Sequence, residues 1–217
     1  MTLQKVARSR HIRLRIQPDG AVLVTMPSYV PFAAALKYAE AQADWILENR
    51  TEQPEFISGD KLGIKYYFEF VPRNISRIAT RRVGHKLVIN YPSSMSVKDL
   101  DVQEAARKLA IRALKKEAEE YLPDWLAGMA TEHGFSYNSA KVKQLRSRWG
   151  SCSSQRDIVL NIFLMKLPDE LIEYVLAHEL THLKHMNHSA AFWATLSEVV
   201  PDAKARRKAL KEFKPAL

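Results

Sequence analysis

The stretch HELTHLKHMNH, from His178 to His188, contains four of the seven histidines in the chain. It overlaps a segment from Pro168 to His185 in which leucine, isoleucine and valine recur around most of the circumference of a helix. A helix that is apolar on nearly all sides is buried, and a buried imidazole is costly unless another group satisfies it. The chain must therefore fold around this helix and supply a partner for its histidines.

His178 and His182 lie four residues apart, so on a helix they share one face and are separated by one turn. Two imidazoles in that position can bind one metal ion. Glu179 follows the first histidine, and its carboxylate is placed to take a proton from a metal-bound water rather than to act as a ligand. The HExxH pattern thus supplies two ligands and a general base within five residues. The alternative, two buried histidines satisfied by ordinary hydrogen bonds, is less favoured.

Catalytic zinc usually has three protein ligands and one open position. The candidates for the third ligand are His185, His188 and, more remotely, Glu198 and Asp202. On an intact helix His185 is about 10 Å from His178 along the axis, too far for two bonds of about 2 Å to one ion. His188 is favoured, because Asn187 tolerates the backbone conformation that ends helices and Ser189 can cap a new helix.

The spacing of His178, His182 and His188 matches the HExxHxxGxxH arrangement, although His185 stands where that motif has glycine. Two alternatives remain at this point. His188 could be a surface histidine at a turn, and His185 could be an imidazole that faces solvent or supports a ligand.

Three segments resemble the YgjP-like metal-dependent hydrolases, a family with a zincin-type metallopeptidase domain. They are RSRWGSC (146–152), IVLNIFL (158–164) and LPDELIEYVLAHELTHLKHMNHSAAFW (167–193). The resemblance implies a zinc-dependent peptidase fold with His178, His182 and His188 as ligands of one Zn²⁺ per chain and Glu179 as the general base. More distantly, the family is similar to the SprT-like proteases, some of which cleave proteins crosslinked to DNA.

The first half of the chain is predicted to be rich in strands. Residues 12–16 alternate apolar and basic side chains, as a half-buried strand does, and Pro18, Asp19 and Gly20 indicate a hairpin turn after them. A helix is expected from Pro31 to Asn49, and β-rich stretches follow near residues 61–71, 75–80 and 86–91. The break after residue 91 predicts two domains, a β-rich domain over 1–94 and a zincin-like metallopeptidase domain over 95–217.

The second half begins with a long helix over about 98–121, which Pro123 is expected to kink or restart and Gly134 to end. Strands are expected over 141–149 and 158–166. The predicted fold class is α+β, with a β-rich N-terminal unit, a long connecting helix, and an HExxH helix beside a small antiparallel sheet.

The resemblance also suggests that a strand next to the HExxH helix borders a substrate cleft, where a peptide adds as a further strand through backbone hydrogen bonds. Arg148, Trp149 and Asn161 are the candidate substrate contacts. The alternatives are core packing for Trp149 and an ordinary salt bridge for the arginine. Cys152 is expected to be a buried, inert thiol.

One cysteine, no signal peptide and no apolar run of 18 residues together favour a cytoplasmic protein without a membrane span. The net charge is +9, and residues 1–96 carry 14 Lys and Arg against 8 Asp and Glu. This basic half could associate weakly with nucleic acid, although a solvated basic strand face is the simpler interpretation.

These observations favour a zinc-dependent hydrolase, most specifically a metallopeptidase that cleaves peptide bonds of peptide or protein substrates by Glu-assisted attack of zinc-bound water. One alternative is a nucleic-acid-associated, SprT-like protease that uses the basic N-terminal half. The other is a non-catalytic interaction module that contains zinc. The sequence does not specify an oligomeric state.

Overall fold

The computed structural model describes residues 1–16, 21–49 and 55–217, and the turn expected at residues 18–20 lies outside them. The chain divides into two compact units, which are described separately: unit 1 comprises Met1–Pro54 with Ala216–Leu217, and unit 2 comprises Glu55–Pro215. The boundary predicted between residues 94 and 95 therefore lies inside unit 2. The strands just before this boundary and the helix after it belong to the same compact unit.

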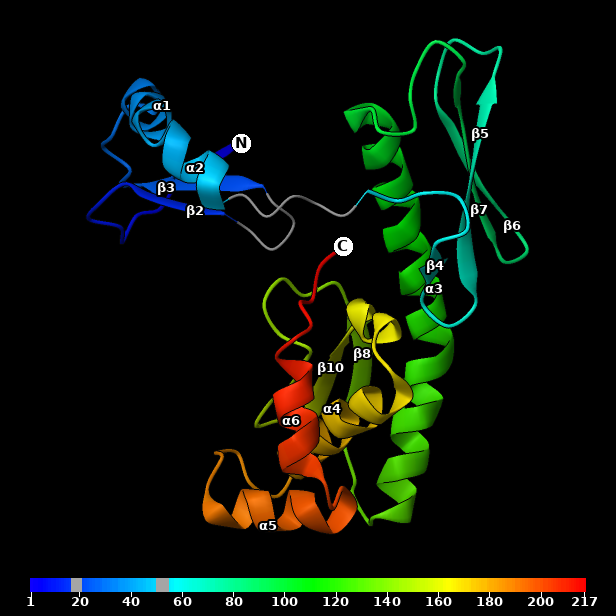
Figure 1. Cartoon of the computed structure of the whole chain (residues 1–217). Helices are drawn as coiled ribbons and strands as arrows, with labels where there is room; N and C mark the ends of the chain where they lie inside the picture. The colour runs from blue at the N-terminus through cyan, green and yellow to red at the C-terminus, as the bar shows by residue number, and fades with distance from the viewer. Residues whose placement is uncertain (17–20, 50–54) are drawn as a thin grey trace. The chain divides into compact units, whose positions relative to one another are not determined.

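Unit 1 contains a three-stranded sheet and two helices (Figure 1). The elements are β1 (Thr2–Lys5), β2 (Arg13–Ile16), β3 (Val22–Met26), α1 (Phe32–Ala41) and α2 (Ala43–Asn49). β3 is the central strand, parallel to β1 and antiparallel to β2. The alternation predicted for β2 is present, because Arg13 and Arg15 are exposed and the residues between and after them are half-buried. A small core of Val24, Met26, Ala35 and Ala39 joins β3 to α1.

The first part of unit 2 is a four-stranded sheet in the order β4-β5-β7-β6. Its strands are β4 (Lys61–Leu62), β5 (Tyr66–Arg73), β6 (Ala79–Val83) and β7 (Lys86–Pro92). β6 and β7 form a hairpin that turns at Gly84, which has a positive φ of 57°. β5 and β7 pair in parallel, so the two central strands can bury side chains such as Phe68, Leu87 and Ile89.

A helix of 33 residues, α3 (Leu100–Glu132), connects the two sheets of unit 2. It contacts β6 and β7 and then β8 and α4, and Figure 1 shows it running past both sheets. The helix continues through Pro123, where a kink or restart was predicted; the carbonyl that loses its hydrogen bond there, at Glu119, belongs to an exposed residue that water can reach. Gly134 ends the helix as predicted, with φ of 66° and a Phe135 N–H bond of 2.8 Å to the carbonyl of Ala130.

The second sheet of unit 2 lies beside the C-terminal helices. Its strands are β8 (Ser139–Lys143), β9 (Gly150–Cys152) and β10 (Asp157–Asn161). The helices that follow in the chain are the 3₁₀ helix η1 (Ile162–Lys166), α4 (Asp169–Thr181), α5 (Ala190–Val199) and α6 (Ala203–Leu210). The sheet was expected to be antiparallel, but it is mixed: β10 is antiparallel to β9 and parallel to β8. β9 and β10 form a hairpin, which occupies one edge of β10, and β8 pairs with the other edge.

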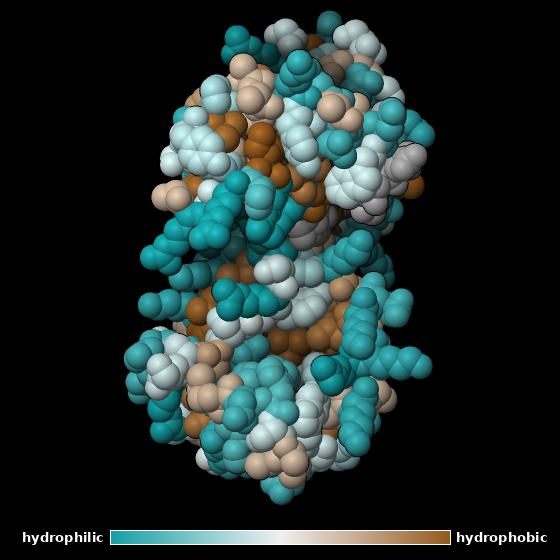
Figure 2. All heavy atoms as spheres, turned by 90° about the vertical axis from the view of Figure 1, so that its left-hand side faces the viewer, coloured by the Kyte–Doolittle hydropathy of each residue, from teal (hydrophilic) through white to brown (hydrophobic). Residues whose placement is uncertain are grey.

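The strand expected over 158–166 ends at Asn161, because the side chain of Asn161 accepts a hydrogen bond from Phe163 N at 3.2 Å and begins the 3₁₀ helix. The fold as a whole is α+β, as predicted. None of the helices in the described ranges combines the length and the apolar composition that crossing a bilayer requires. Figure 2 shows one face of the molecule, on which hydrophilic side chains (teal) surround patches of apolar surface (brown).

Candidate active site

Helix α4 carries the first residues of the site. Pro168 precedes it, and Asp169 and Glu170 lie in its first turn, where negative charge favours the positive end of the helix dipole. Its middle is buried on most sides. The helix ends at Thr181, four residues earlier than predicted, but His182 keeps a helical conformation and its N–H bonds to the carbonyl of His178 at 3.3 Å. The two histidines therefore remain one turn apart on one face.

The structure brings three imidazoles to one point. The Nε2 atom of His178 lies 3.2 Å from Nε2 of His182 and 3.0 Å from Nε2 of His188. One nitrogen from each ring lies within 4.8 Å of the others, a grouping that could hold a metal ion. His188 reaches this point because the chain turns after α4 and restarts as α5, with the side chain of Ser189 accepting from Phe192 N at 3.4 Å.

The distances between these nitrogens are close to those between nitrogen ligands of one zinc ion. Three nitrogens bound to a tetrahedral zinc at about 2.05 Å lie roughly 3.3 Å apart. A hydrogen-bonded cluster fits less well, because a neutral imidazole has only one N–H and three converging Nε2 atoms share few donors. Burial, and then the neighbouring imidazoles, lower the pKa of His178 to about 3, so its ring is neutral and keeps a lone pair for a ligand bond.

His185 points elsewhere. Its Nε2 lies 3.1 Å from Oγ1 of Thr195 on α5, and its backbone carbonyl lies 3.0 Å from Nδ1 of His182. The second contact fixes the tautomer of His182, because an Nδ1–H that donates to the carbonyl leaves Nε2 free to face the cluster. His185 thus contributes to the site through its backbone.

Phe192 forms the floor of the cluster, a role that the sequence analysis missed. It is fully buried, and its ring centroid lies 4.9, 4.8 and 4.7 Å from those of His178, His182 and His188. Its role could have been inferred from the sequence, because Phe192 follows His188 by four residues and lies in the first turn of the helix that Ser189 begins. An apolar floor restricts the three rings and excludes water from beneath them.

Glu179 lies beside the cluster on α4 and is only 5% exposed. Its Oε2 is buried and has no hydrogen-bond partner within the described part of the chain. Burial raises the pKa of Glu179 to about 8, and the charge of Arg148 opposes this shift. The side chain passes close to the backbone of β9: a Cβ added to Gly150 would lie 2.6 Å from Oε1 and 2.8 Å from Cγ of Glu179.

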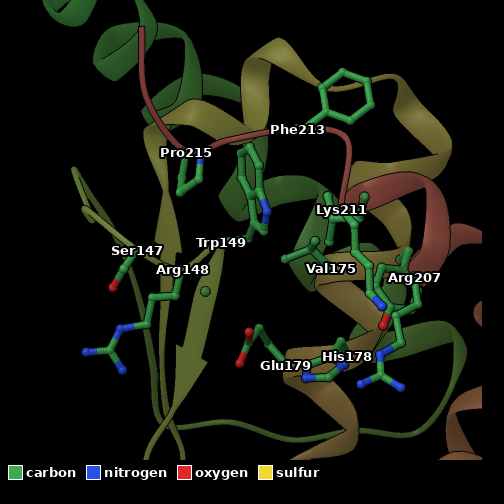
Figure 3. Close-up of a pocket in the computed structure, with 13 residues that line it drawn as sticks. Ser147, Arg148, Trp149, Val175, His178, Glu179, Arg207, Lys211, Phe213 and Pro215 are labelled. Carbon is green, nitrogen blue, oxygen red and sulfur yellow. The ribbon is translucent and has the colours of Figure 1, made fainter. Parts of the chain in front are cut away.

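A cavity of about 440 Å³ opens next to Glu179 and His178 (Figure 3). Three segments line it: the loop that leads into β9, one face of α4, and the chain from the last turn of α6 to Pro215. Arg148 and Trp149, the candidate substrate contacts, line this cavity, and their contact with substrate stays a prediction. Its other walls come from a segment, residues 207–215, to which the sequence analysis assigned no role in the site.

Asn161 does not line the cavity. It is fully buried, and its side-chain amide donates to the carbonyls of Leu145 at 2.9 Å and Arg148 at 2.7 Å. Its side-chain oxygen accepts from the backbone of Phe163. These bonds hold the loop before β9, a different role from the substrate contact predicted for Asn161, which stays a prediction. Cys152 is half-buried, and burial raises the pKa of its thiol, which keeps it protonated and inert.

Comparison with known proteins identifies similarities for most of the chain. A family model described as YgjP-like, metallopeptidase domain matches residues 10–213. No curated protein matches. Among solved structures, the metallopeptidase zymogen abylysin of Pyrococcus abyssi is 26% identical, with 42% of this chain and 93% of that chain covered and a TM-score of 0.38. The metallopeptidase zymogen jannalysin of Methanocaldococcus jannaschii is 19% identical with the same coverages and a TM-score of 0.36.

Proposed function

The chain belongs to the YgjP-like metallopeptidase family, and from this premise we propose that it is a zinc-dependent peptidase with Glu179 as its general base. We propose His178, His182 and His188 as the ligands of one Zn²⁺ per chain. A metallopeptidase acts on peptide bonds, so peptides or proteins are its substrate class. The ligand set, the choice of zinc and the role of Glu179 go beyond what the family match alone shows.

The observation that carries the proposal is the convergence of three imidazoles, with Nε2 of His178 lying 3.0 Å from that of His188 and 3.2 Å from that of His182. Beside them lies Glu179, whose buried Oε2 has no partner among the described residues. Three neutral nitrogen ligands match the preference of catalytic zinc, which keeps a fourth position open. The same arrangement argues against a structural zinc, because such sites are closed by four protein ligands. It therefore favours an enzyme over the alternative of a non-catalytic zinc module.

Zinc bound here would act as a Lewis acid toward a substrate carbonyl and lower the pKa of a water molecule to about 7. Glu179 would take the proton of the attacking water on its free Oε2 and return it to the nitrogen of the departing amine. A metal cation bound by the three imidazoles would oppose the effect of burial on Glu179 and favour its ionised form, which is the form that accepts a proton. His182, fixed by the carbonyl of His185, would keep its ring in the orientation that the site requires.

The first experiment is a metal analysis of the purified protein and two histidine variants. We expect about one zinc per chain in the wild type, little zinc in His188→Ala, and nearly wild-type zinc in His185→Ala. His185→Ala is the matched control, because it removes an imidazole from the same turn without removing a converging nitrogen. Zinc retained by His188→Ala and lost by His185→Ala would reverse the ligand assignment, and a protein that takes up no divalent metal would end the proposal.

A second candidate function is a nucleic-acid-associated protease. It is favoured by the exposed arginines of β2, Arg13 and Arg15, which extend from a strand of unit 1. Such an association would weaken steeply as salt increases, because phosphate contacts release counterions. A gel retardation assay at 50 and 200 mM salt tests it. Absence of DNA or RNA retardation at the lower salt concentration would remove this candidate and leave the peptidase proposal unaffected.

A further inference from the structure

The cavity beside Glu179 has an excess of positive charge. Arg148, Arg207 and Lys211 line it, and Glu179 is its one acidic lining residue. Figure 3 shows Arg207 and Lys211 on the side of His178, with Arg148 on the opposite side of the view and Glu179 between them. If Glu179 serves the reaction, the cations of this cavity have no acidic partner within it.

The position of Arg207 is fixed by neighbours other than an acidic residue of the described part of the chain. The preceding residue, Arg206, is anchored by ion pairs with Glu173 and Asp202 and by a bond of 2.9 Å to the carbonyl of Glu170. Arg207 points to a different side of α6, where its guanidinium carbon lies 4.9 Å from the ring centroid of Trp193. Stacking of this kind fixes the plane of a guanidinium and leaves its N–H groups available.

Lys211 follows one turn after Arg207, and it still has a helical conformation with φ of −67° and ψ of −21°. Two like charges at this spacing repel each other. Neither side chain forms an ion pair with any residue in the described ranges 1–16, 21–49 and 55–217. Two unpaired cations facing one cavity therefore form a site in which an anion would relieve the repulsion.

The remaining walls of the cavity are mainly apolar. Trp149, Val175, Leu210, Phe213 and Pro215 line it together with the two cations. Such a site favours a substrate residue with a hydrocarbon body and a carboxylate at its end. An arginine fork binds a carboxylate through two parallel hydrogen bonds, which gives direction as well as attraction.

We propose that Arg207 and Lys211 form a specificity subsite that binds a substrate carboxylate next to the cleaved peptide bond. The carboxylate belongs either to an acidic side chain or to the C-terminus of the substrate. This subsite rests on the proposed peptidase function, because it assigns a substrate preference to the same cavity.

The test uses four matched pools of acetylated octapeptides with randomised neutral residues. Three pools end in a C-terminal amide and carry Glu, Gln or Lys at one fixed position; the fourth carries Gln and ends in a free carboxylate. Cleavage by the zinc-loaded protein is measured by mass spectrometry, and retention of each pool on immobilised metal-free protein is measured in parallel. We expect roughly tenfold faster cleavage and stronger retention of the Glu pool or of the free-carboxylate pool than of the neutral amide pool.

Two double variants assign the preference to the subsite. R207Q/K211M keeps the side-chain stems and should reduce the preference to less than about twofold, whereas R207E/K211E should favour the Lys pool. The matched control is K204M/K208M, which removes the same charge from two exposed positions one turn apart on α6 that do not line the cavity. The control should keep the wild-type preference.

The outcomes separate the subsite from the peptidase function. A preference for the Glu pool assigns the carboxylate to a side chain, and a preference for the free-carboxylate pool assigns it to the substrate C-terminus. Equal handling of all pools, or a preference that survives in R207Q/K211M, overturns the subsite. If no pool is cleaved, the peptidase proposal fails, and retention on the metal-free protein still decides whether the subsite binds carboxylates.

Discussion

Unit 2 contains two buried glutamates that differ in their hydrogen-bond partners. Glu117 on α3 is fully buried, and its carboxylate accepts hydrogen bonds from the backbone N–H groups of Ile64 at 3.2 Å and Lys65 at 2.9 Å. Glu179 on α4 is nearly as buried, but its Oε2 has no partner within the described residues. Both carboxylates press against a glycine, Gly63 or Gly150.

The hydrogen bonds of Glu117 hold the loop at Ile64 and Lys65, whereas Oε2 of Glu179 makes no hydrogen bond to the described residues. Burial raises the pKa of both groups; the two backbone hydrogen bonds oppose this shift at Glu117, whereas at Glu179, where it reaches about 8, the charge of Arg148 opposes it. An unsatisfied buried group is destabilising, so its presence indicates a gain elsewhere. At Glu179 that gain would be a proton acceptor beside a metal.

The largest effect should come from replacing each glutamate by glutamine. Glu179→Gln should lower the rate of peptide hydrolysis by roughly 10³-fold while the bound metal is retained, because the proposed general base is lost and the proposed ligands are not. Glu117→Gln should keep the rate per folded molecule within about twofold but destabilise the fold, since the amide places an N–H₂ donor near two N–H donors. Initial rates, metal analysis and urea unfolding of both variants measure this contrast.

A Glu179→Gln protein that keeps more than a tenth of the activity would exclude Glu179 as the base. A large loss of activity in the folded Glu117→Gln protein would instead show that the two glutamates do not divide between fold and chemistry. Either result breaks the comparison at a defined residue.

The second effect concerns stability at Gly63. This residue has φ of 64°, and a Cβ there would overlap the carboxylate of Glu117 and lie 3.2 Å from Leu114. Gly63→Ala should therefore lower the free energy of unfolding by roughly 3 kcal/mol, from backbone strain and overpacking together. Gly84 is the matched control: its φ is 57° but no atom of the described residues lies within 4 Å of the added Cβ, so Gly84→Ala should cost only about 1 kcal/mol.

Urea unfolding of the two alanine variants gives the difference directly. Equal losses at Gly63 and Gly84 would mean that the loop before β5 adjusts freely, and that Glu117 does not anchor it.

Features that depend on neighbours in the sequence could be predicted from it. The positions of His178 and His182 on one face follow from helical spacing, and the end of α3 at Gly134 follows from the backbone freedom of glycine. The restart of the helix at Ser189, which brings His188 back toward the other histidines, depends on a local cap as well. Their roles as ligands stay predictions.

Features that depend on residues far apart in the chain could not be predicted in this way. Glu117 contacts a loop more than 50 residues earlier, and no local pattern indicates that contact. Asn161 lies at the end of a β-like run, but its side chain accepts from Phe163 N and begins a 3₁₀ helix there, and the same side chain holds the distant loop before β9. Arg207 has no signal in the sequence, because many basic residues lie on exposed helix faces.

The third effect is on the rate rather than on stability. Gly150→Ala would place a methyl group 2.6 Å from Oε1 of Glu179, and the carboxylate must move to relieve that contact. A displacement of about 1 Å can cost up to 10²-fold, so we expect kcat to fall by roughly 10- to 100-fold with a smaller change in KM. Gly128→Ala is the control, because in the described part of the chain Gly128 has open space at the position of an added Cβ and alanine favours the helix. It should leave the rate unchanged and add about 0.5 to 1 kcal/mol of stability.

An unchanged kcat in Gly150→Ala would show that Glu179 tolerates a different position. The close contact with β9 would then serve packing, and the two glycine–glutamate pairs of unit 2 would have the same role.

The smallest effect is the pH dependence that Glu117 gives to stability. Its pKa in the folded protein is raised above the ordinary 4.5 by burial, so the folded state holds a proton there more tightly than the unfolded chain. The stabilisation from this group is present at pH values below 4.5 and is lost as pH rises through the folded pKa. The difference in the free energy of unfolding between wild type and Glu117→Gln should therefore be largest near pH 4 and decrease toward pH 7.

Urea unfolding of both metal-free proteins measures this difference, because the titration of the histidines is common to both and cancels. A difference that does not change with pH would mean that the N–H groups of Ile64 and Lys65 fully offset the burial of the charge, which would place Glu117 still further from the unsatisfied Glu179.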